Sequence, residues 1–402
     1  MKIDSLTIEN FKCFKTEKTF DFGRITILTG ANSSGKSSVI YAALGALQSK
    51  DFPFNYSLNG KYVQLGDCSD LINEGSSDKY FSVNLLFDSG ENIKTKWTPE
   101  TENNQPNLKR LSFEIGDIKI NALRESDNSL TTKLLSKTGS IANTKLVESL
   151  NKDFEDFELS SKAYFSDDNT DELIIKNSEI YRFEETMRVD PFNFFSQSSR
   201  GKALEWLSKI YQAADYRVQK LETKINFIGA FRQKPQRIYF EKNRIDFKIG
   251  VDGDGFLDQI VEWEKRNNGK INKLKEVLRD FKLVEEIETH RLNGGKLELL
   301  VKTNKIEEFN SLTNVGFGVS QFMPIIVADL QLSDDSTLFL AEPETHLHPS
   351  VQSKIGDYIV SQVNETEKNY VIETHSEYFL NRIRLAIVKG ELKKEDIKVY
   401  FL

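Results

Sequence analysis

The chain has 402 residues, of which 39% are hydrophobic and 29% are charged, a composition typical of a folded globular protein. Its 54 basic and 61 acidic residues give a formal net charge of −7, which argues against a surface covered in nucleic-acid-binding patches. No apolar run approaches the roughly 20 residues that a membrane helix needs, so we expect a cytoplasmic protein without membrane contact.

The first motif follows two predicted strands, at 3–9 and 25–29. Residues 30–37 read GANSSGKS and match the phosphate-binding P-loop pattern G-x-x-x-x-G-K-[ST] at every fixed position. A buried strand precedes the match and a helical pattern over 37–48 follows it, which is the order that a phosphate-binding loop requires. We therefore expect ATP to be bound by Gly30, Asn32, Ser33, Ser34, Gly35, Lys36, Ser37 and Ser38.

Two side chains of this loop have predicted roles. Lys36 is expected to reach the β- and γ-phosphates, and the Ser37 hydroxyl is expected to ligate the metal Mg²⁺. The expected cofactors are therefore ATP and Mg²⁺. The alternative is a glycine- and serine-rich turn with a chance lysine, but it does not explain the flanking strand and helix.

The region after the P-loop helix predicts strands at 80–87 and 92–97 and then becomes irregular. From 100 to 225, polar stretches interrupt short strand patterns at 111–115 and 173–175, and a helical pattern spans about 202–224. We interpret 100–225 as an insertion between an N-terminal half, 1–99, and a C-terminal half, 226–402. Basic residues outnumber acidic ones between 201 and 250, so this segment is either a solvated helix face or a nucleic-acid contact.

The C-terminal half is more regular. It predicts helices at 256–266 and 271–281 and a strand at 296–302 after an Asn-Gly-Gly turn. Residues 316–321 read GFGVSQ and precede the predicted start of an apolar helix, 322–330. A hydrophobic strand at 337–341 runs directly into Glu342 and Glu344, as a Walker B element does. Another buried strand, 370–373, ends at Thr374-His375-Ser376.

Five segments together carry a family resemblance. "ENFKCF", "GANSSGKSS", "GFGVSQ", "EPETHLHP" and "ETHSEYFLNRI" occur in the order and spacing seen in ABC-type ATPases of the SMC, RecF and OLD group. The chain most resembles the AAA-family, OLD-like ATPases of bacterial defence loci, over roughly 1–90 and 226–402. This resemblance implies an α/β fold: a two-lobed ABC/SMC-like ATPase head with an inserted, partly helical α+β arm.

The resemblance also implies roles for particular residues. Gly318, Ser320 and Gln321 would form the signature motif, which meets the γ-phosphate of ATP bound to a second protomer. Glu342 would polarise the attacking water, and His375 would sense the γ-phosphate. These implied roles predict a homo-oligomer, a dimer or higher, with ATP sites between its subunits.

Three residues have weaker assignments. Gln64 is either a Q-loop residue or a plain surface glutamine. Arg232 is either a phosphate-sensing or interface arginine or an ordinary surface charge. Glu344 either supports the catalytic acid or is a charge favoured at a helix start. His346 and His348 are two apart, but the family places a dimer contact there, which disfavours zinc.

One position departs from the family pattern. The family normally has an acid directly before the catalytic glutamate, and this chain has Ala341. Either Ser37 and the phosphates hold the metal with help from Glu342, or metal affinity and hydrolysis are reduced. We therefore expect an ATP-dependent switch with slow turnover.

Three functions are compatible with these motifs. The first is an ATPase sensor or scaffold in anti-phage defence that controls a separate effector, a nuclease or toxin. The chain ends soon after His375, so we expect no Toprim nuclease domain, or else a shortened or split family member. The second is a RecF-like DNA-repair ATPase that binds DNA directly. The third is an inactive nucleotide-binding interaction module.

Overall fold

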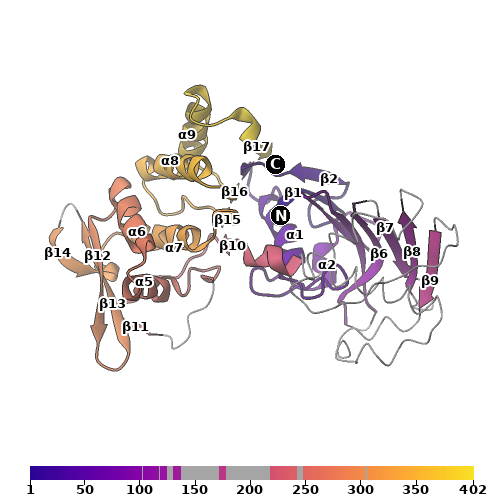
Figure 1. The fold of residues 1–402 in the computed structure, drawn as a ribbon, viewed down its shortest axis with the longest axis horizontal. Coiled ribbons are helices and arrows are strands. Elements are labelled where there is room, and N and C mark those ends of the chain that lie inside the picture. Colours follow the sequence, from indigo (N-terminus) through magenta and orange to yellow (C-terminus); the bar gives the residue numbers. More distant parts are fainter. Residues whose placement is uncertain are drawn as a thin grey trace, which may run out of the picture. The chain divides into compact units, whose positions relative to one another are not determined.

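The computed structural model describes residues 1–101, 103–116, 118–124, 130–136, 172–177, 218–241, 248–303 and 306–402. The chain divides into two compact units, each built from separate stretches of sequence (Figure 1). The first unit combines Met1–Asp21 with Tyr41–Glu222, and the second combines Phe22–Ile40 with Thr223–Leu402. This division differs from the sequence boundaries at 99 and 225, because the P-loop segment groups with the C-terminal half of the chain.

An antiparallel sheet of eight strands dominates the first unit. The strands are β1 (Ile3–Glu9), β2 (Lys18–Asp21), β4 (Phe81–Phe87), β5 (Asn92–Pro99), β6 (Pro106–Ile115), β7 (Ile118–Arg124), β8 (Leu130–Ser136) and β9 (Glu172–Asn177). Their order in the sheet is β2-β1-β4-β5-β6-β7-β8-β9. The strands predicted at 111–115 and 173–175 are confirmed within β6 and β9, so the described strands of 100–225 continue this sheet.

Aromatic side chains fill the core of the first unit. The ring of Tyr56 lies 5.4 Å from that of Phe81 and 5.8 Å from that of Trp97, centroid to centroid. All three side chains are fully buried, and the Tyr56 hydroxyl donates to the carbonyl of Ala42 at 3.1 Å. The short helix α2 (Cys68–Leu71) also belongs to this unit. Of the helix predicted at 202–224, residues 218–223 are helical, and the rest lies outside the described residues.

A parallel sheet of five strands forms the centre of the second unit. Its strands are β10 (Ile225–Ile228), β15 (Thr337–Ala341), β16 (Asn369–Glu373), β3 (Ile25–Thr29) and β17 (Ile397–Phe401), in that spatial order. Every residue of β10, β15, β16 and β3 is buried, as expected for the near-continuous apolar strands of a parallel sheet. Because all five strands are parallel, their carboxyl ends meet at one edge.

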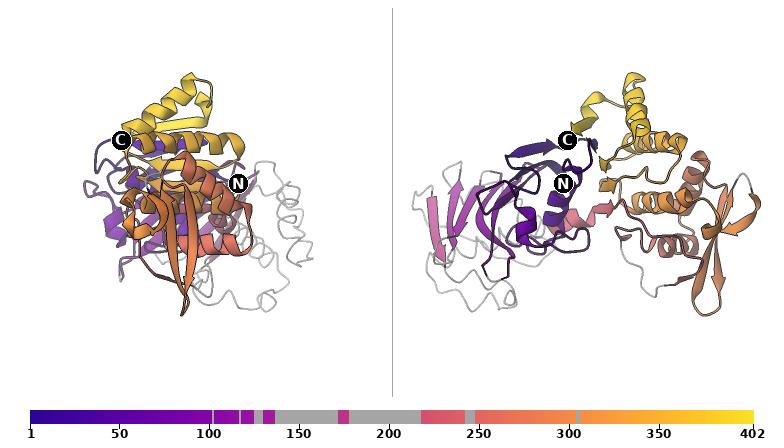
Figure 2. Two further views of the ribbon diagram at one scale, coloured as in Figure 1. Left: turned by 90° about the vertical axis from the view of Figure 1, so that its left-hand side faces the viewer. Right: turned by 180° about the vertical axis from the view of Figure 1, so that it is seen from behind.

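Helices and a small antiparallel sheet complete the second unit (Figure 2). The helices are α5 (Phe256–Lys265), α6 (Gly269–Asp280), α7 (Phe317–Gln331), α8 (Pro349–Glu365) and α9 (Glu377–Val388), and α1 (Lys36–Gln48) begins in this unit. The small sheet contains β11 (Tyr239–Phe240), β12 (Glu286–Leu292), β13 (Lys296–Thr303) and β14 (Ile306–Ser311). Short 3-10 turns cover Leu312–Asn314 and Lys394–Asp396.

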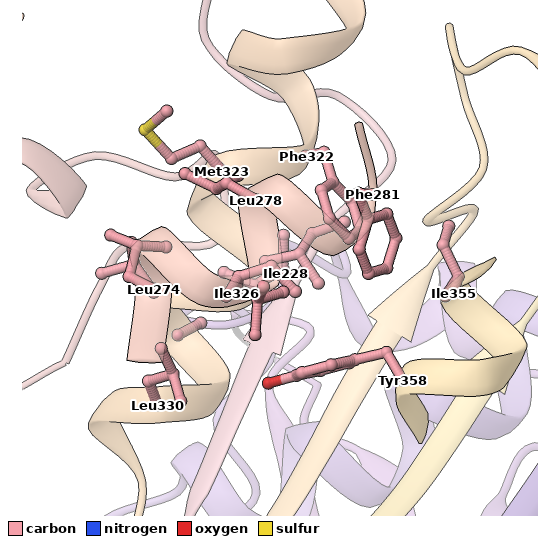
Figure 3. Close-up of a cluster of buried hydrophobic side chains, with 14 of the residues drawn as sticks. Ile228, Leu274, Leu278, Phe281, Phe322, Met323, Ile326, Leu330, Ile355 and Tyr358 are labelled. Carbon is pink, nitrogen blue, oxygen red and sulfur yellow. The ribbon is translucent and has the colours of Figure 1, made fainter. Parts of the chain in front are cut away.

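The core of the second unit lies between helices and the parallel sheet. Figure 3 shows Leu274 and Leu278 of α6, Phe322 and Ile326 of α7 and Ile228 of β10 in one cluster. Phe281 and Phe322 are in ring contact, with centroids 4.4 Å apart. The two helices predicted at 256–266 and 271–281 are confirmed as α5 and α6. Within the described residues, no helix combines the length and the apolar character needed to cross a membrane.

A buried hydrogen-bond network connects α7, α8 and β16. The Asp329 carboxylate, fully buried in α7, accepts hydrogen bonds from Tyr358 at 2.5 Å and Tyr370 at 2.9 Å. The Lys368 ammonium lies 3.4 Å from this carboxylate and donates to the Asp329 carbonyl at 2.7 Å. Burial raises the pKa values of Tyr358 and Tyr370 well above the usual range of a tyrosine, so both hydroxyls stay protonated and can donate hydrogen bonds. The network therefore satisfies a charge that would otherwise be costly to bury.

Candidate functional site

The P-loop leaves β3 at the carboxyl edge of the parallel sheet and leads into α1, as the sequence predicts. Gly30 has φ +138° and Gly35 has φ +106°, backbone conformations that side chains rarely adopt. A Cβ atom at Gly30 would also lie 2.1 Å from the carbonyl oxygen of Leu402. The loop conformation therefore requires glycine at position 30.

Lys36 is buried at the start of α1, with only 3% of its surface exposed. Its ammonium donates to the carbonyl of Ala31 at 2.7 Å and lies 3.4 Å from that of Gly30. The positive charge is thus in contact with backbone carbonyls of its own loop. This is the arrangement expected of a group that binds phosphate, because such a charge needs anionic or carbonyl partners.

Ser37 connects the P-loop to a neighbouring strand. Its hydroxyl donates to the Glu373 carboxylate at 2.8 Å. Glu373 is the last residue of β16 and is 6% exposed. Burial raises the pKa of this carboxyl, while the hydrogen bond from Ser37 and the charge of Lys36 oppose the shift. Sequence analysis missed Glu373, although its position at the carboxyl end of a buried strand was a readable signal.

Glu342 follows β15 at the same edge of the sheet. Its backbone has φ 45°, in the left-handed region, which costs a non-glycine residue about 1–3 kcal/mol. Its N–H donates to the Glu373 carbonyl at 2.8 Å, and its carbonyl accepts from the Arg232 guanidinium at 3.0 Å. Such strain is concentrated at functional sites, and here the hydrogen bonds on both sides maintain it.

Arg232 follows β10 and is 7% exposed, so the interpretation as an ordinary surface charge is wrong. Burial lowers its pKa to about 10, and the nearby carboxylates of Glu344 and Glu342 oppose this shift. Its Nε and Nη1 atoms have no hydrogen-bond acceptor among the described residues. The guanidinium therefore retains donors for a further anionic group.

Glu344 is 9% exposed and accepts a hydrogen bond from the His375 N–H at 2.7 Å. Because α8 begins at Pro349, with His348 as its N-cap, the interpretation of Glu344 as a helix-start charge is wrong. Glu344 instead joins the loop after β15 to the loop after β16. His375 itself is exposed at the end of β16.

The predicted signature segment lies on α7. This helix begins at Phe317, so Ser320 lies inside its first turns rather than before the helix, as the sequence pattern suggested. Ser320 is buried, and Gln321 donates to the carbonyl of Gln233 at 3.1 Å. A Cβ atom at Gly318 would lie 3.1 Å from the His346 carbonyl oxygen, so the glycine lets the helix approach the loop after β15 closely.

The remaining candidates have other surroundings. Gln64 belongs to the first unit, where its exposed side chain donates to the carbonyl of Gly60 at 2.9 Å. The His348 ring accepts from the Ser350 N–H at 3.2 Å and so caps α8. Among the described residues, no cluster of three or more His, Cys, Asp or Glu side chains could hold a metal ion.

The carboxyl edge of the parallel sheet therefore brings together residues from four parts of the sequence. The P-loop follows β3, Arg232 follows β10, Glu342 follows β15, and His375 follows β16. In open parallel sheets, ligands bind at this edge. The arrangement offers a buried cation, several acidic residues, of which Glu342 has a strained backbone, and a phosphate-binding loop, which together suit nucleoside triphosphate chemistry.

Comparison with protein-family models identifies the class of domain. A family model described as AAA ATPase domain matches residues 1–380. No curated protein matches the chain.

Several solved structures resemble the chain at low identity. The SMC head domain from Thermotoga maritima is 11% identical, with a TM-score of 0.37 and coverage of 95% of this chain and 92% of that chain. The Smc head domain with an extended coiled coil, bound to the C-terminal domain of ScpA and derived from Pyrococcus furiosus, is 13% identical, with a TM-score of 0.42 and coverage of 95% and 91%. An SmcHead bound to the C-winged helix domain of ScpA is 13% identical, with a TM-score of 0.40 and coverage of 95% and 92%.

Proposed function

The chain belongs to the family of AAA ATPase domains, and we propose that it binds ATP with Mg²⁺ and hydrolyses it slowly as a molecular switch. The observation that carries the proposal is the P-loop at the carboxyl edge of the parallel sheet, with Lys36 buried in the loop. Loops after three neighbouring strands supply acidic and basic groups to the same edge. In this proposal ATP is the substrate, and the switch responds to whether the P-loop site is occupied by ATP.

The proposed roles follow from the contacts of each residue. Lys36 binds phosphate oxygens when it exchanges the Ala31 carbonyl for the ligand. Glu342 orients the attacking water and accepts its proton. His375 lies next to Glu344 through its backbone and contacts the γ-phosphate. Arg232, which has unpartnered donors, contributes positive charge beside Glu342.

The residues beside the P-loop fit Mg²⁺. This ion prefers oxygen ligands, and the Ser37 hydroxyl already lies against a carboxylate oxygen at 2.8 Å. Ser37 would hold the ion together with phosphate oxygens of the nucleotide. When bound, Mg²⁺ neutralises charge that develops on the phosphates during transfer.

We further propose that two protomers share each ATP site. The P-loop of one protomer would face the Ser320 segment of its partner, so ATP binding would favour association and hydrolysis would favour release. The placement of Ser320 on a helix that begins at Phe317 supports this, because helix N-terminal turns favour negative charge.

Light scattering coupled to size exclusion tests the shared site. The Glu342→Gln variant should bind ATP without turning it over, so adding ATP and Mg²⁺ should at least double its mass relative to the nucleotide-free protein. Lys36→Ala, which lacks the phosphate-binding charge, is the matched control and should not respond. An unchanged mass for Glu342→Gln at saturating ATP contradicts the shared site.

The downstream role that we propose is control of a separate effector, a nuclease or toxin, in anti-phage defence. Its support is the resemblance of the five sequence motifs to OLD-like ATPases. Purification of the tagged chain from its native host, followed by identification of co-purifying proteins, tests this role. A nuclease-like partner that dissociates or activates with ATP supports it.

Direct DNA binding through 201–250 is the competing function. Of its basic residues that are described, Arg232 is only 7% exposed and Lys224 is paired with Asp335. Neither residue therefore adds a free charge to a basic surface patch. A filter-binding assay with a salt titration separates the functions, because a steep negative slope of log K against log salt indicates phosphate contacts.

A further inference from the structure

The strand that lacks an acid lies beside a strand that ends in one. β15 and β16 are parallel neighbours, and their register places Ala341 directly beside Glu373. Each is the last residue of its strand, so both occupy the edge of the sheet where the P-loop begins. The methyl group of Ala341 and the carboxylate-bearing residue Glu373 therefore lie side by side on adjacent strands.

The Glu373 carboxylate reaches the P-loop serine. Ser37 donates to its Oε1 atom at 2.8 Å, and the Glu373 carbonyl accepts the N–H of Glu342 at 2.8 Å. One residue thus contacts both the expected metal-binding hydroxyl and the backbone of the expected catalytic glutamate. Neither contact involves Ala341.

The carboxylate is buried without a hydrogen-bonded cationic partner. Glu373 is 6% exposed, and its carboxylate accepts a hydrogen bond from the neutral Ser37 hydroxyl, while Lys36 and His375 act on it only through their charge. The Lys36 ammonium is instead hydrogen-bonded to the carbonyls of its own loop. Buried charges in proteins are normally paired or coordinate metals. The side chain is therefore placed as a ligand for a cation that arrives with the nucleotide.

We propose that Glu373 supplies, from β16, the carboxylate that holds Mg²⁺ together with Ser37, in place of the acid that is absent at position 341. This inference rests on the proposed ATP binding. The carboxylate for the metal would then come from β16 instead of β15. With Glu373 as the metal ligand, Glu342 is not needed to hold the ion. It can then act only on the attacking water.

A purely structural role is the competing explanation. In that case Glu373 would only fix the Ser37 side chain and the P-loop. Glu373→Gln separates the two roles, because glutamine keeps the size and the hydrogen-bond acceptor for Ser37 but removes the charge that a cation requires. Restoring a carboxylate on the neighbouring strand with Ala341→Asp provides a second, independent variant.

The test measures binding rather than turnover. The dissociation constant of a fluorescent ATP analogue is determined with Mg²⁺ and with EDTA, and Mn²⁺ binding to the protein with the analogue is followed by electron paramagnetic resonance. For wild type we expect the metal to strengthen nucleotide binding. For Glu373→Gln we expect metal affinity to fall on the order of 10–100-fold, while binding in EDTA stays within about twofold. Ala341→Asp in the Glu373→Gln background should recover most of the loss.

Each other outcome has a defined meaning. If Glu373→Gln binds the metal as wild type does, or loses nucleotide binding equally with Mg²⁺ and EDTA, the inference is overturned and Glu373 is structural. If the double variant fails to recover metal affinity, the exchange between strands is overturned. If wild type itself binds no nucleotide, the proposed function fails instead, which distinguishes the two failures.

Discussion

The residues around the P-loop determine how fast the bound nucleotide can be turned over. Glu342 is held in a left-handed backbone conformation by hydrogen bonds from its N–H to Glu373 and from Arg232 to its carbonyl. The adjacent Ala341 offers no ligand, and we propose that Glu373 of β16 supplies the carboxylate for the metal. We propose that a site without an acid at position 341 favours nucleotide occupancy over rapid hydrolysis.

Hydrolysis should therefore be slow and should depend on Glu342. We expect wild type to release phosphate from ATP at less than about 10 s⁻¹, within or below the usual range for phosphoryl-transfer enzymes. Glu342→Gln removes the general base and should lower this rate by roughly 10²–10⁴-fold. A coupled phosphate-release assay measures both, with Glu367→Gln as a surface control. Turnover at 10 s⁻¹ or faster, or a Glu342→Gln rate equal to that of wild type, contradicts this account.

At the scale of elements, local patterns predicted only some strands and helices of the second unit, among them β3, β15, β16, α5 and α6. β3, β15 and β16 are fully buried strands, and α5 and α6 have helical spacing of buried residues such as Ile260 and Leu274. The start of α7 was misplaced because Gly316 and Gly318 flank Phe317, and glycine has low helix propensity. The strand β12 is mostly exposed and carries little apolar alternation, so local pattern gave no signal for it.

The site was only partly predictable, for a physical reason. The P-loop is a local sequence pattern, and its loop, strand and helix were all expected. The contact between Ser37 and Glu373 joins residues 336 positions apart, and only the order of strands in the sheet brings them together. Arg232 was ambiguous for the same reason, since its burial depends on β10 lying next to β15.

The buried network around Asp329 should contribute to the stability of the second unit. Asp329→Asn leaves Lys368 buried without its partner and should lower the free energy of unfolding by about 3–5 kcal/mol. The matched control is Glu367→Gln, which removes a 75% exposed partner of Arg24 and should cost about 0–1 kcal/mol. Urea unfolding measures both variants. If both variants lower the free energy of unfolding equally, the Asp329 network does not stabilise the second unit as we expect.

At the scale of the whole molecule, the second unit assembles the site from distant parts of the chain. The short segment Phe22–Ile40 contributes β3 and the P-loop, and Thr223–Leu402 contributes the other strands. All the expected nucleotide-contacting residues except Gln64 therefore belong to one compact unit. Nucleotide binding should follow from this unit alone, because its sheet places the P-loop beside Glu342 and Glu373.

Nucleotide binding is tested most directly by the dissociation constant of ATP, measured by calorimetry for wild type and for Lys36→Ala. We predict that wild type binds ATP in the presence of Mg²⁺. Lys36→Ala should weaken binding on the order of 10–100-fold, the loss expected for a charge-assisted contact of about 1.5–3 kcal/mol. Lys50→Ala, which removes an exposed lysine beyond the end of α1, should bind as wild type does. If wild type binds no ATP, or if Lys36→Ala binds equally well, the P-loop is not a nucleotide site and the proposed function is wrong.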